Sequence, residues 1–299
     1  MCCDRYEMRR ALRQRLGRRP VRTVLAALCA IALLGVLAQE GATWIQWRVF
    51  TSQLTALEAA SPSPDKLVTL SFGFHGRLVT LDVPVSDYAV RRAEEFDFSP
   101  TFGRVGHWRE RYVSAAVLTE SRTGFMDALA TSLRRQRTRL ELDADEYVEL
   151  MTRATQSIPY GHVGDPLKTP LEVVATGSGV CTEKSVLLAS LLVHEGYGAA
   201  VWSLKGHSHV GAGVLTSGEG FAHTGYAFVE TTEPAYVGQL PGGYAASGPV
   251  YPAPQLIEIA SGRSYQADPQ VGYILWLRAS AERASRHGGS GRRDVLMGL

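Results

Sequence analysis

Three residues in one stretch of the chain have the types and the order of a thiol nucleophile, a base and an orienting acid. Cys181 opens an apolar run, His209 lies in the segment G-H-S-H-V-G-A-G-V, and Glu230 lies in G-Y-A-F-V-E-T-T. A cysteine attacks a carbonyl carbon as its thiolate, and its base needs an acid that fixes the imidazole tautomer. The segment therefore predicts nucleophilic catalysis by Cys181, with His209 as base and Glu230 as third member.

Cys181 lies where a thiol would be activated. It follows Gly177 and Gly179 and precedes the apolar run 186–193, which predicts a buried helix with the cysteine in its first turn. Unpaired N–H groups and the positive end of the helix dipole stabilise a thiolate there, and they can also bind an oxyanion. The alternative is a small packed core residue, but the glycines and the apolar helix favour a nucleophile.

The segments around His209 and Glu230 are expected to be paired strands. Residues 199–204, 209–215 and 225–232 have the composition of strands, and 255–260 is expected to be a fourth. If the strands on either side of the loop 216–223 pair symmetrically, residue 214 faces 225 and His209 faces Glu230. His207 is the second candidate for the base, and His223 is expected to be a loop residue.

The rest of the body is expected to combine helices with a hairpin, in an α+β fold. Residues 67–85 predict a β-hairpin that turns at 73–76. Helices are predicted over 119–137 and from a cap at Asp143 to Ile158-Pro159, whereas 87–112 is expected to be irregular helix and loop.

The N-terminus predicts a membrane anchor. Eight arginines precede the uncharged run 23–38, which places the N-terminus in the cytoplasm and the main domain outside it. A cleaved signal peptide ending near Ala38 and a buried soluble helix are the alternatives. Acylation of Cys2 and Cys3 is possible on chemical grounds, but no modification is the preferred interpretation. The expected division is a basic leader (1–22), a transmembrane signal anchor (23–43), a linker with the hairpin (44–114), a catalytic domain (115–284) and a disordered tail (285–299).

Composition and motifs limit the other functions. The formal net charge is +2, and neither a P-loop nor a Rossmann glycine motif nor a paired C-x-x-C is present. The missing motifs predict no cofactor. The net charge by itself argues neither for nor against nucleic acid, and no nucleic-acid partner is expected. A zinc site built from Cys181, His207, His209 and Glu230 is a minor alternative, and no metal is predicted.

At these same residues the chain resembles the transglutaminase-like superfamily, which has a papain-like Cys-His-acid arrangement. The matching segments are G-x-G-x-C-x-x-K-S-x-L-L-A-x-L-L at 177–192, the strand at 209–214, Y-x-x-V-E-T-T at 226–232, and the upstream segment 156–160. The likeness covers about residues 115–245. It departs from the common pattern at Glu230, where Asp is usual, and at Thr182, where many relatives carry an acid.

The resemblance implies Cys181 as nucleophile, His209 as base and Glu230 as third member, with Tyr160 a candidate for the second oxyanion donor. It implies a membrane-anchored cysteine protease or amidase that cleaves an amide bond through a thioester, with a protein or peptide of the cell envelope as substrate. Two alternatives remain: an acyl transferase that cross-links proteins, and a binding module of the same fold without catalysis.

Overall fold

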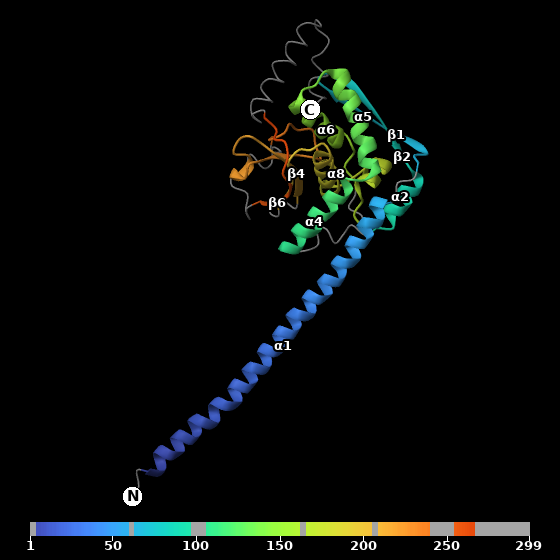
Figure 1. The fold of residues 1–299 in the computed structure, drawn as a ribbon. Helices are drawn as coiled ribbons and strands as arrows, with labels where there is room; N and C mark the ends of the chain where they lie inside the picture. Colours follow the sequence, from blue (N-terminus) through green and yellow to red (C-terminus); the bar gives the residue numbers. More distant parts are fainter. Residues whose placement is uncertain are drawn as a thin grey trace. The chain divides into compact units, whose positions relative to one another are not determined.

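A computed structural model describes residues 4–59, 63–96, 106–161, 166–204, 209–239 and 254–266. The described chain mixes helices with two antiparallel sheets (Figure 1), in agreement with the α+β expectation. It divides into two compact units, Met1–Ser52 and Gln53–Leu299. The expected tail at 285–299, His207, Cys2 and Cys3 lie outside the described residues.

Most of one long helix forms the first unit, and its last residues belong to the second. Helix α1 (Asp4–Ala59) has 56 residues, and its segment Thr23–Ala56 is long and apolar enough to cross a membrane. A helix of this size is about 84 Å long, whereas the hydrocarbon core of a bilayer is about 30 Å thick. The helix therefore continues past residue 43, where the anchor was expected to end. Its length and composition fit a membrane anchor, and a signal sequence passes the same test.

A β-hairpin and a helix begin the core of the second unit. Strands β1 (Lys66–Phe74) and β2 (Arg77–Val85) pair around His75-Gly76, both at positive φ, as a two-residue hairpin turn requires. The expected hairpin is confirmed. The inward side chains of β2 pack against helix α5 (Gly124–Leu140) in the same core cluster as the helices.

The helices before the site differ in part from the expectation. Helix α2 (Asp87–Glu94) and the start of helix α4 (His107–Glu120) lie in the region that was expected to be irregular helix and loop, and both are regular helices. The helix expected from 119 begins instead at 124, because Thr123 caps α5 and separates it from α4. The buried stripe of α4 lies among charged and aromatic residues, which hid its periodicity; it consists of Tyr112, Val113, Ala116, Val117 and Glu120.

Helix α6 (Ala144–Gln156) begins as the sequence predicted. The Asp143 carboxylate accepts from the N–H groups of Asp145 and Glu146, and the Glu146 side chain accepts from the N–H of Asp143. This reciprocal pair is a capping box. Helix α7 (Pro170–Thr176) follows with its own cap at Thr169.

The second sheet holds the strands that follow the cysteine helix. Its order is β5-β4-β3-β6, formed by β3 (Ala199–Leu204), β4 (His209–Leu215), β5 (Tyr226–Val229) and β6 (Gln255–Ala260). All four expected strands are present, although β5 is shorter than predicted. The predicted register is wrong by two residues, because Val214 pairs with Ala227 rather than with residue 225. The loop causes this difference. The Thr216 N–H bonds to the Gly225 carbonyl, so the pairing continues one residue beyond the end of β4.

Helix α8 (Cys181–His194) lies at the centre of this unit. It contacts β3 and β4 of the sheet and the helices α4, α5, α6 and α7 (Figure 1). Every residue from Glu183 to Leu192 is buried, so the helix that carries the cysteine is held on all sides. Truncating one of its leucines to alanine would cost about 2–5 kcal/mol. The start of α8 is therefore a rigid platform.

Candidate active site

Two glycines place Cys181 at the start of α8. Gly177 ends α7 in the left-handed conformation with φ of 66°, which glycine adopts without strain. At Gly179 a Cβ atom would lie 3.0 Å from Cγ1 of Val173 and 3.2 Å from Cγ of Lys184, so no larger residue fits there without displacement. Cys181 is the first residue of the helix, and it is 8% exposed.

Glu183 holds the turn in front of the cysteine. One of its carboxylate oxygens accepts from the Val180 N–H at 2.8 Å and the other from the Lys168 N–H at 2.8 Å. The carboxylate therefore satisfies N–H groups that would otherwise be unpaired at the helix start. Glu183 also joins the loop before α7 to the first turn of α8.

His209 and Glu230 form a direct hydrogen bond. The distance from Nε2 of His209 to Oε2 of Glu230 is 2.9 Å, and the side chains are 13% and 1% exposed. The other carboxylate oxygen accepts from the N–H of Thr231 at 2.9 Å, and from the N–H and hydroxyl of Thr232 at 2.7 and 2.5 Å. Every bond that Glu230 accepts fixes its orientation toward His209.

The observed register explains why the acid is a glutamate. Continued by one residue from Ala212 and Val229, the pairing places position 230 opposite Gly211 and diagonally from His209. A diagonal pair is farther apart than a directly opposite one, so the longer side chain suits the distance. Gly211 has no side chain that could lie between them. A larger residue does not fit there, because its Cβ would lie 2.4 Å from Cε2 of Phe228.

Three groups act on the Cys181 thiol and favour its ionised form. The His209 side chain, the Val210 backbone N–H and the Tyr160 hydroxyl all interact with its sulfur. Because Nε2 of His209 faces Glu230, the ring offers Nδ1 to the sulfur. The structure thus brings together the three residues that the sequence singled out.

These contacts set the charge state of the site. Burial raises the pKa of the Cys181 thiol, but the hydrogen bonds from His209 and Val210 outweigh it and lower the pKa. Burial lowers the pKa of His209, yet its bonds to Cys181 and Glu230 raise it to about 9. Burial also opposes ionisation of Glu230, and the bond from His209 nevertheless holds its pKa below the ordinary value. All three pKa shifts favour the charged forms, which are a thiolate, an imidazolium and a carboxylate.

Tyr160 lies beside the thiol at the open side of the site. Residues 159–161 pair with Gly179 through bonds from the Gly179 N–H to the Pro159 carbonyl and from the Gly161 N–H to the Gly179 carbonyl, each 3.1 Å long. The Tyr160 hydroxyl interacts with both the thiol and the backbone N–H of Cys181. The side chain is 57% exposed. Its hydroxyl therefore occupies one of the N–H groups at which an oxyanion would bind.

Sequence reasoning did not assign roles to three buried residues behind the site. The Lys184 ammonium donates to the Ile158 carbonyl at 2.6 Å, and burial lowers its pKa to about 8. The Gln156 amide donates to the backbone carbonyl of Glu230 at 3.0 Å. The Ser185 hydroxyl donates to the Val210 carbonyl at 3.1 Å, so α8 holds the strand beside His209. Their only sequence signal was their place in the segments at 156–160 and 177–192.

The remaining candidates lie elsewhere. His223 is a loop residue that pairs with Glu219 at 2.9 Å on the surface. Within the described ranges, no group of three or more His, Cys, Asp or Glu side chains has the arrangement of a metal site. The zinc alternative also needed His207, which the structure does not describe.

Comparisons with known proteins do not identify a relative. No protein-family model matches the chain, and neither a curated protein nor a solved structure matches it.

Proposed function

We propose that this chain is a membrane-anchored cysteine protease or amidase with a papain-like, transglutaminase-like catalytic domain. The observation that carries the proposal is the buried hydrogen bond between His209 and Glu230, 2.9 Å long, with the Cys181 thiol on the other ring nitrogen. A helix start, a base and an oriented acid are the parts that thiol catalysis needs.

The proposed reaction begins with attack of the Cys181 thiolate on the carbonyl carbon of an amide. The new C–S bond places the negative charge on the carbonyl oxygen, and N–H groups at the start of α8 can stabilise it. The C–N bond then breaks as the His209 imidazolium gives its proton to the leaving amine, which leaves a thioester. Water next attacks the thioester while His209 takes its proton, and the acid product and the thiolate are released.

The position of Tyr160 adds one step before the chemistry. Its hydroxyl contacts both the sulfur and the N–H of Cys181, so an oxyanion at that N–H requires the phenol to move aside. Because the side chain is 57% exposed, rotation does not require the core to open. Substrate binding therefore includes displacement of the Tyr160 hydroxyl.

The membrane placement completes the proposal. Helix α1 would span the bilayer once through its apolar segment, and the arginines at its start favour the cytoplasm. The domain would then lie outside the cytoplasm and act on proteins or peptides of the cell envelope. Protease added to intact cells should degrade the domain, and complete protection would reverse this topology.

Alkylation of Cys181 against pH tests the proposed activation of the thiol. The full chain is used with Cys2, Cys3 and Cys29 replaced by serine, so that only Cys181 reacts with iodoacetamide. We expect the rate to rise with a midpoint well below about 8.5, the value of a free cysteine. The rate should disappear in Cys181→Ala, and in His209→Ala the midpoint should move up. An unreactive thiol, or an ordinary midpoint in both proteins, would refute an activated nucleophile.

A further inference from the structure

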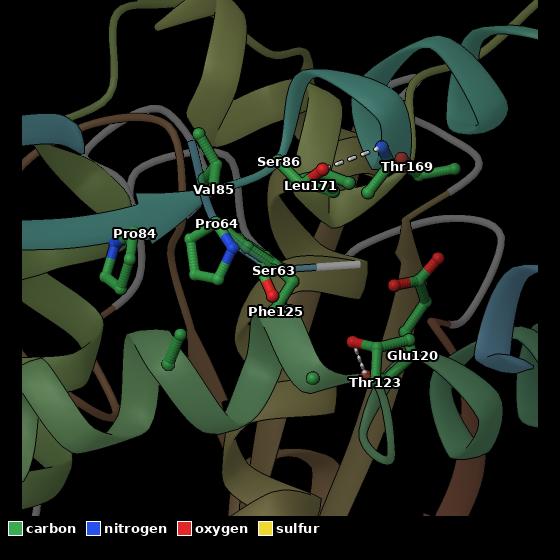
Figure 2. Close-up of a pocket in the computed structure, with 13 residues that line it drawn as sticks. Ser63, Pro64, Pro84, Val85, Ser86, Glu120, Thr123, Phe125, Thr169 and Leu171 are labelled. Carbon is green, nitrogen blue, oxygen red and sulfur yellow. Dashed lines mark hydrogen bonds between the residues drawn. The ribbon is translucent and has the colours of Figure 1, made fainter. Parts of the chain in front are cut away.

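A cavity of about 300 Å³ lies in the second unit, apart from the candidate active site. It is bounded by the end of β2, the start of α2, the junction between α4 and α5, and the start of α7 (Figure 2). None of Cys181, His209, Glu230 and Tyr160 lines it. Its volume is at the lower end of the range of small-molecule sites. The lining residues are Ser63, Pro64, Pro84, Val85, Ser86, Ala89, Glu120, Thr123, Gly124, Phe125, Ala128, Thr169 and Leu171.

One buried carboxyl group in this lining has an unused oxygen. Glu120 is 1% exposed, and its Oε1 has no hydrogen-bond partner. The neighbouring Thr123 hydroxyl does not serve it, because it donates to the Glu120 backbone carbonyl at 2.9 Å. Figure 2 shows the carboxyl turned away from Thr123 and toward the side of Leu171 and Thr169. Buried polar atoms in native proteins are nearly always paired, so this oxygen is a position at which a ligand in the cavity can form a hydrogen bond.

The electrostatic surroundings of Glu120 are negative. Burial, and in second place the charge of Glu172, raise its pKa to about 8. Glu120 is also the last residue of α4, where the helix dipole disfavours an anion. Among the described residues, no lysine, arginine or histidine lines the cavity. Two carboxyl groups and the end of α4 favour a positive charge here, and no described side chain of the lining supplies one, whereas the helix starts capped by Ser86, Thr123 and Thr169 contribute only partial positive charge.

The rest of the lining is suited to an apolar body. Pro64, Pro84, Val85, Phe125 and Leu171 supply carbon surface around the carboxyl. The Ser86 hydroxyl is already used, because it accepts from the Ala89 N–H at the start of α2. A ligand would thus bury its apolar part against these walls and meet its one charged partner at Glu120.

We propose that this cavity binds a small apolar molecule that carries a protonated amino group, with the ammonium paired to Glu120. An anion would face Glu120 and Glu172 without a counter-charge. A neutral alcohol could accept the Glu120 proton in a hydrogen bond, but it would leave the negative surroundings uncompensated. An ammonium satisfies the unused oxygen and forms a charge-assisted hydrogen bond in a buried place. This site is additional to the proposed thiol chemistry and does not depend on it.

Calorimetry with a matched pair of probes tests the proposal. The full chain with Cys181→Ala, in lipid nanodiscs, is titrated at pH 7 with phenethylamine and separately with 2-phenylethanol, and empty nanodiscs correct for partition into lipid. The Cys181→Ala background keeps the amine from reacting at the thiol site. We expect saturable binding of one amine per chain, with the alcohol weaker by about tenfold or more. The amine should also release a proton from Glu120 to the buffer.

Two variants locate the binding. Glu120→Gln keeps the shape and removes the charge, so the preference for the amine should vanish. Ala128→Leu fills the cavity, so binding of both probes should be lost. The proposal is overturned if neither probe binds saturably, if the alcohol binds as tightly as the amine, or if amine binding survives both substitutions. The comparison of the two probes on the parent chain decides the matter even if a variant does not fold.

Discussion

Glu230 and Glu120 are buried to the same extent, at 1% exposure each, and yet their ionisation differs in direction. Burial raises the pKa of both, but hydrogen bonds from His209 and Thr232 bring the pKa of Glu230 below its ordinary value. Glu120 has an unpaired oxygen and a negative neighbour, and its pKa is about 8. The partners of a buried carboxyl therefore decide its charge more than its burial does.

The same difference separates the two regions around these residues. Near Cys181 the polar groups are joined in one network that runs from Gln156 and Ser185 through the strands to His209. Near Glu120 the cavity walls are mostly apolar, and the carboxyl stands alone. A closed network is suited to holding a reactive group in place, whereas an open one leaves a position for a ligand.

The largest effect on activity is expected from a substitution of Glu230, the acid of the hydrogen-bond network at Cys181. Glu230→Gln removes the charge that stabilises the imidazolium, so the pKa of His209 should fall from about 9 toward its ordinary value. Loss of the acid in comparable triads lowers turnover by a factor on the order of 10⁴. NMR titration of His209 and the rate of Cys181 alkylation at pH 6 measure the change.

Glu219→Gln is the matched control for that substitution. Glu219 also lies 2.9 Å from a histidine, His223, but both side chains are more than 80% exposed. Its removal should leave the alkylation rate unchanged. Equal effects of the two substitutions, or an unchanged pKa of His209 in Glu230→Gln, would show that the buried pair does not set the charge of the base.

The next largest effect is expected on the stability of the folded protein, through the ionisation of Glu120. The pKa of Glu120 is about 8 in the folded protein and about 4.3 in an unfolded chain. Its folded pKa is thus raised, so its contribution to stability is complete below about 4.3 and is lost as the pH rises through 8. Glu120→Gln does not titrate, so its stability relative to the parent chain should be greater at pH 9 than below pH 4 by about 5 kcal/mol.

Urea unfolding of the two proteins at pH 5 and pH 9 measures this difference. The gap between them should widen from pH 5 to pH 9. Glu230 acts in the opposite sense, because its lowered pKa gives stability that is lost on acidification. Parallel stability profiles of the parent chain and Glu120→Gln would mean that Glu120 ionises normally and that the contrast between the two glutamates is wrong.

A smaller effect tests the packing that supports the network. In Gly179→Ala the new methyl would lie 3.0 Å from Val173 and 3.2 Å from Lys184, and such overpacking costs about 1–3 kcal/mol. Gly73→Ala is the control, because nothing lies within 4 Å of a Cβ there. Thermal unfolding should show a lower midpoint for Gly179→Ala than for Gly73→Ala. Equal midpoints would contradict the claim that close packing requires a glycine at position 179.

The sequence was informative where local chemistry decides the structure. The cap at Asp143, the helix start at Cys181 and the turn at His75-Gly76 each follow from residue types at fixed positions. The meeting of His209 and Glu230 was predicted from a register that was wrong by two residues. It still held, because a shift by two keeps a residue on the same face of a strand, whereas a shift by one would not.

Other features depend on tertiary contacts that no local pattern contains. The Lys184 ammonium bonds to carbonyls at the end of α6, 26 and 28 residues earlier in the chain. The cavity at Glu120 is formed by five elements, β2, α2, α4, α5 and α7, from different parts of the second unit. The start of α4 lies in a stretch for which the sequence predicted only irregular helix and loop, because its charged and aromatic residues hide the periodicity of the buried stripe.

The smallest effect is expected from Tyr160, the exposed residue that interacts with the Cys181 thiol, in contrast to the buried residues of the network. Tyr160→Phe removes one hydrogen-bond donor from the thiolate, so the pKa of Cys181 should rise and alkylation at pH 6 should become slower. We expect the rate to fall by a few-fold, because a hydrogen bond to a charged group is worth about 1.5–3 kcal/mol and this one is partly exposed to water. Tyr88→Phe is the control, because Tyr88 is exposed to a similar extent, 51% against 57%. The loss should be far smaller than that in His209→Ala, because His209 supplies both a proton and a charge. Faster alkylation in Tyr160→Phe would instead mean that the phenol mainly shields the thiol from the reagent, and that the buried residues of the network alone stabilise the thiolate.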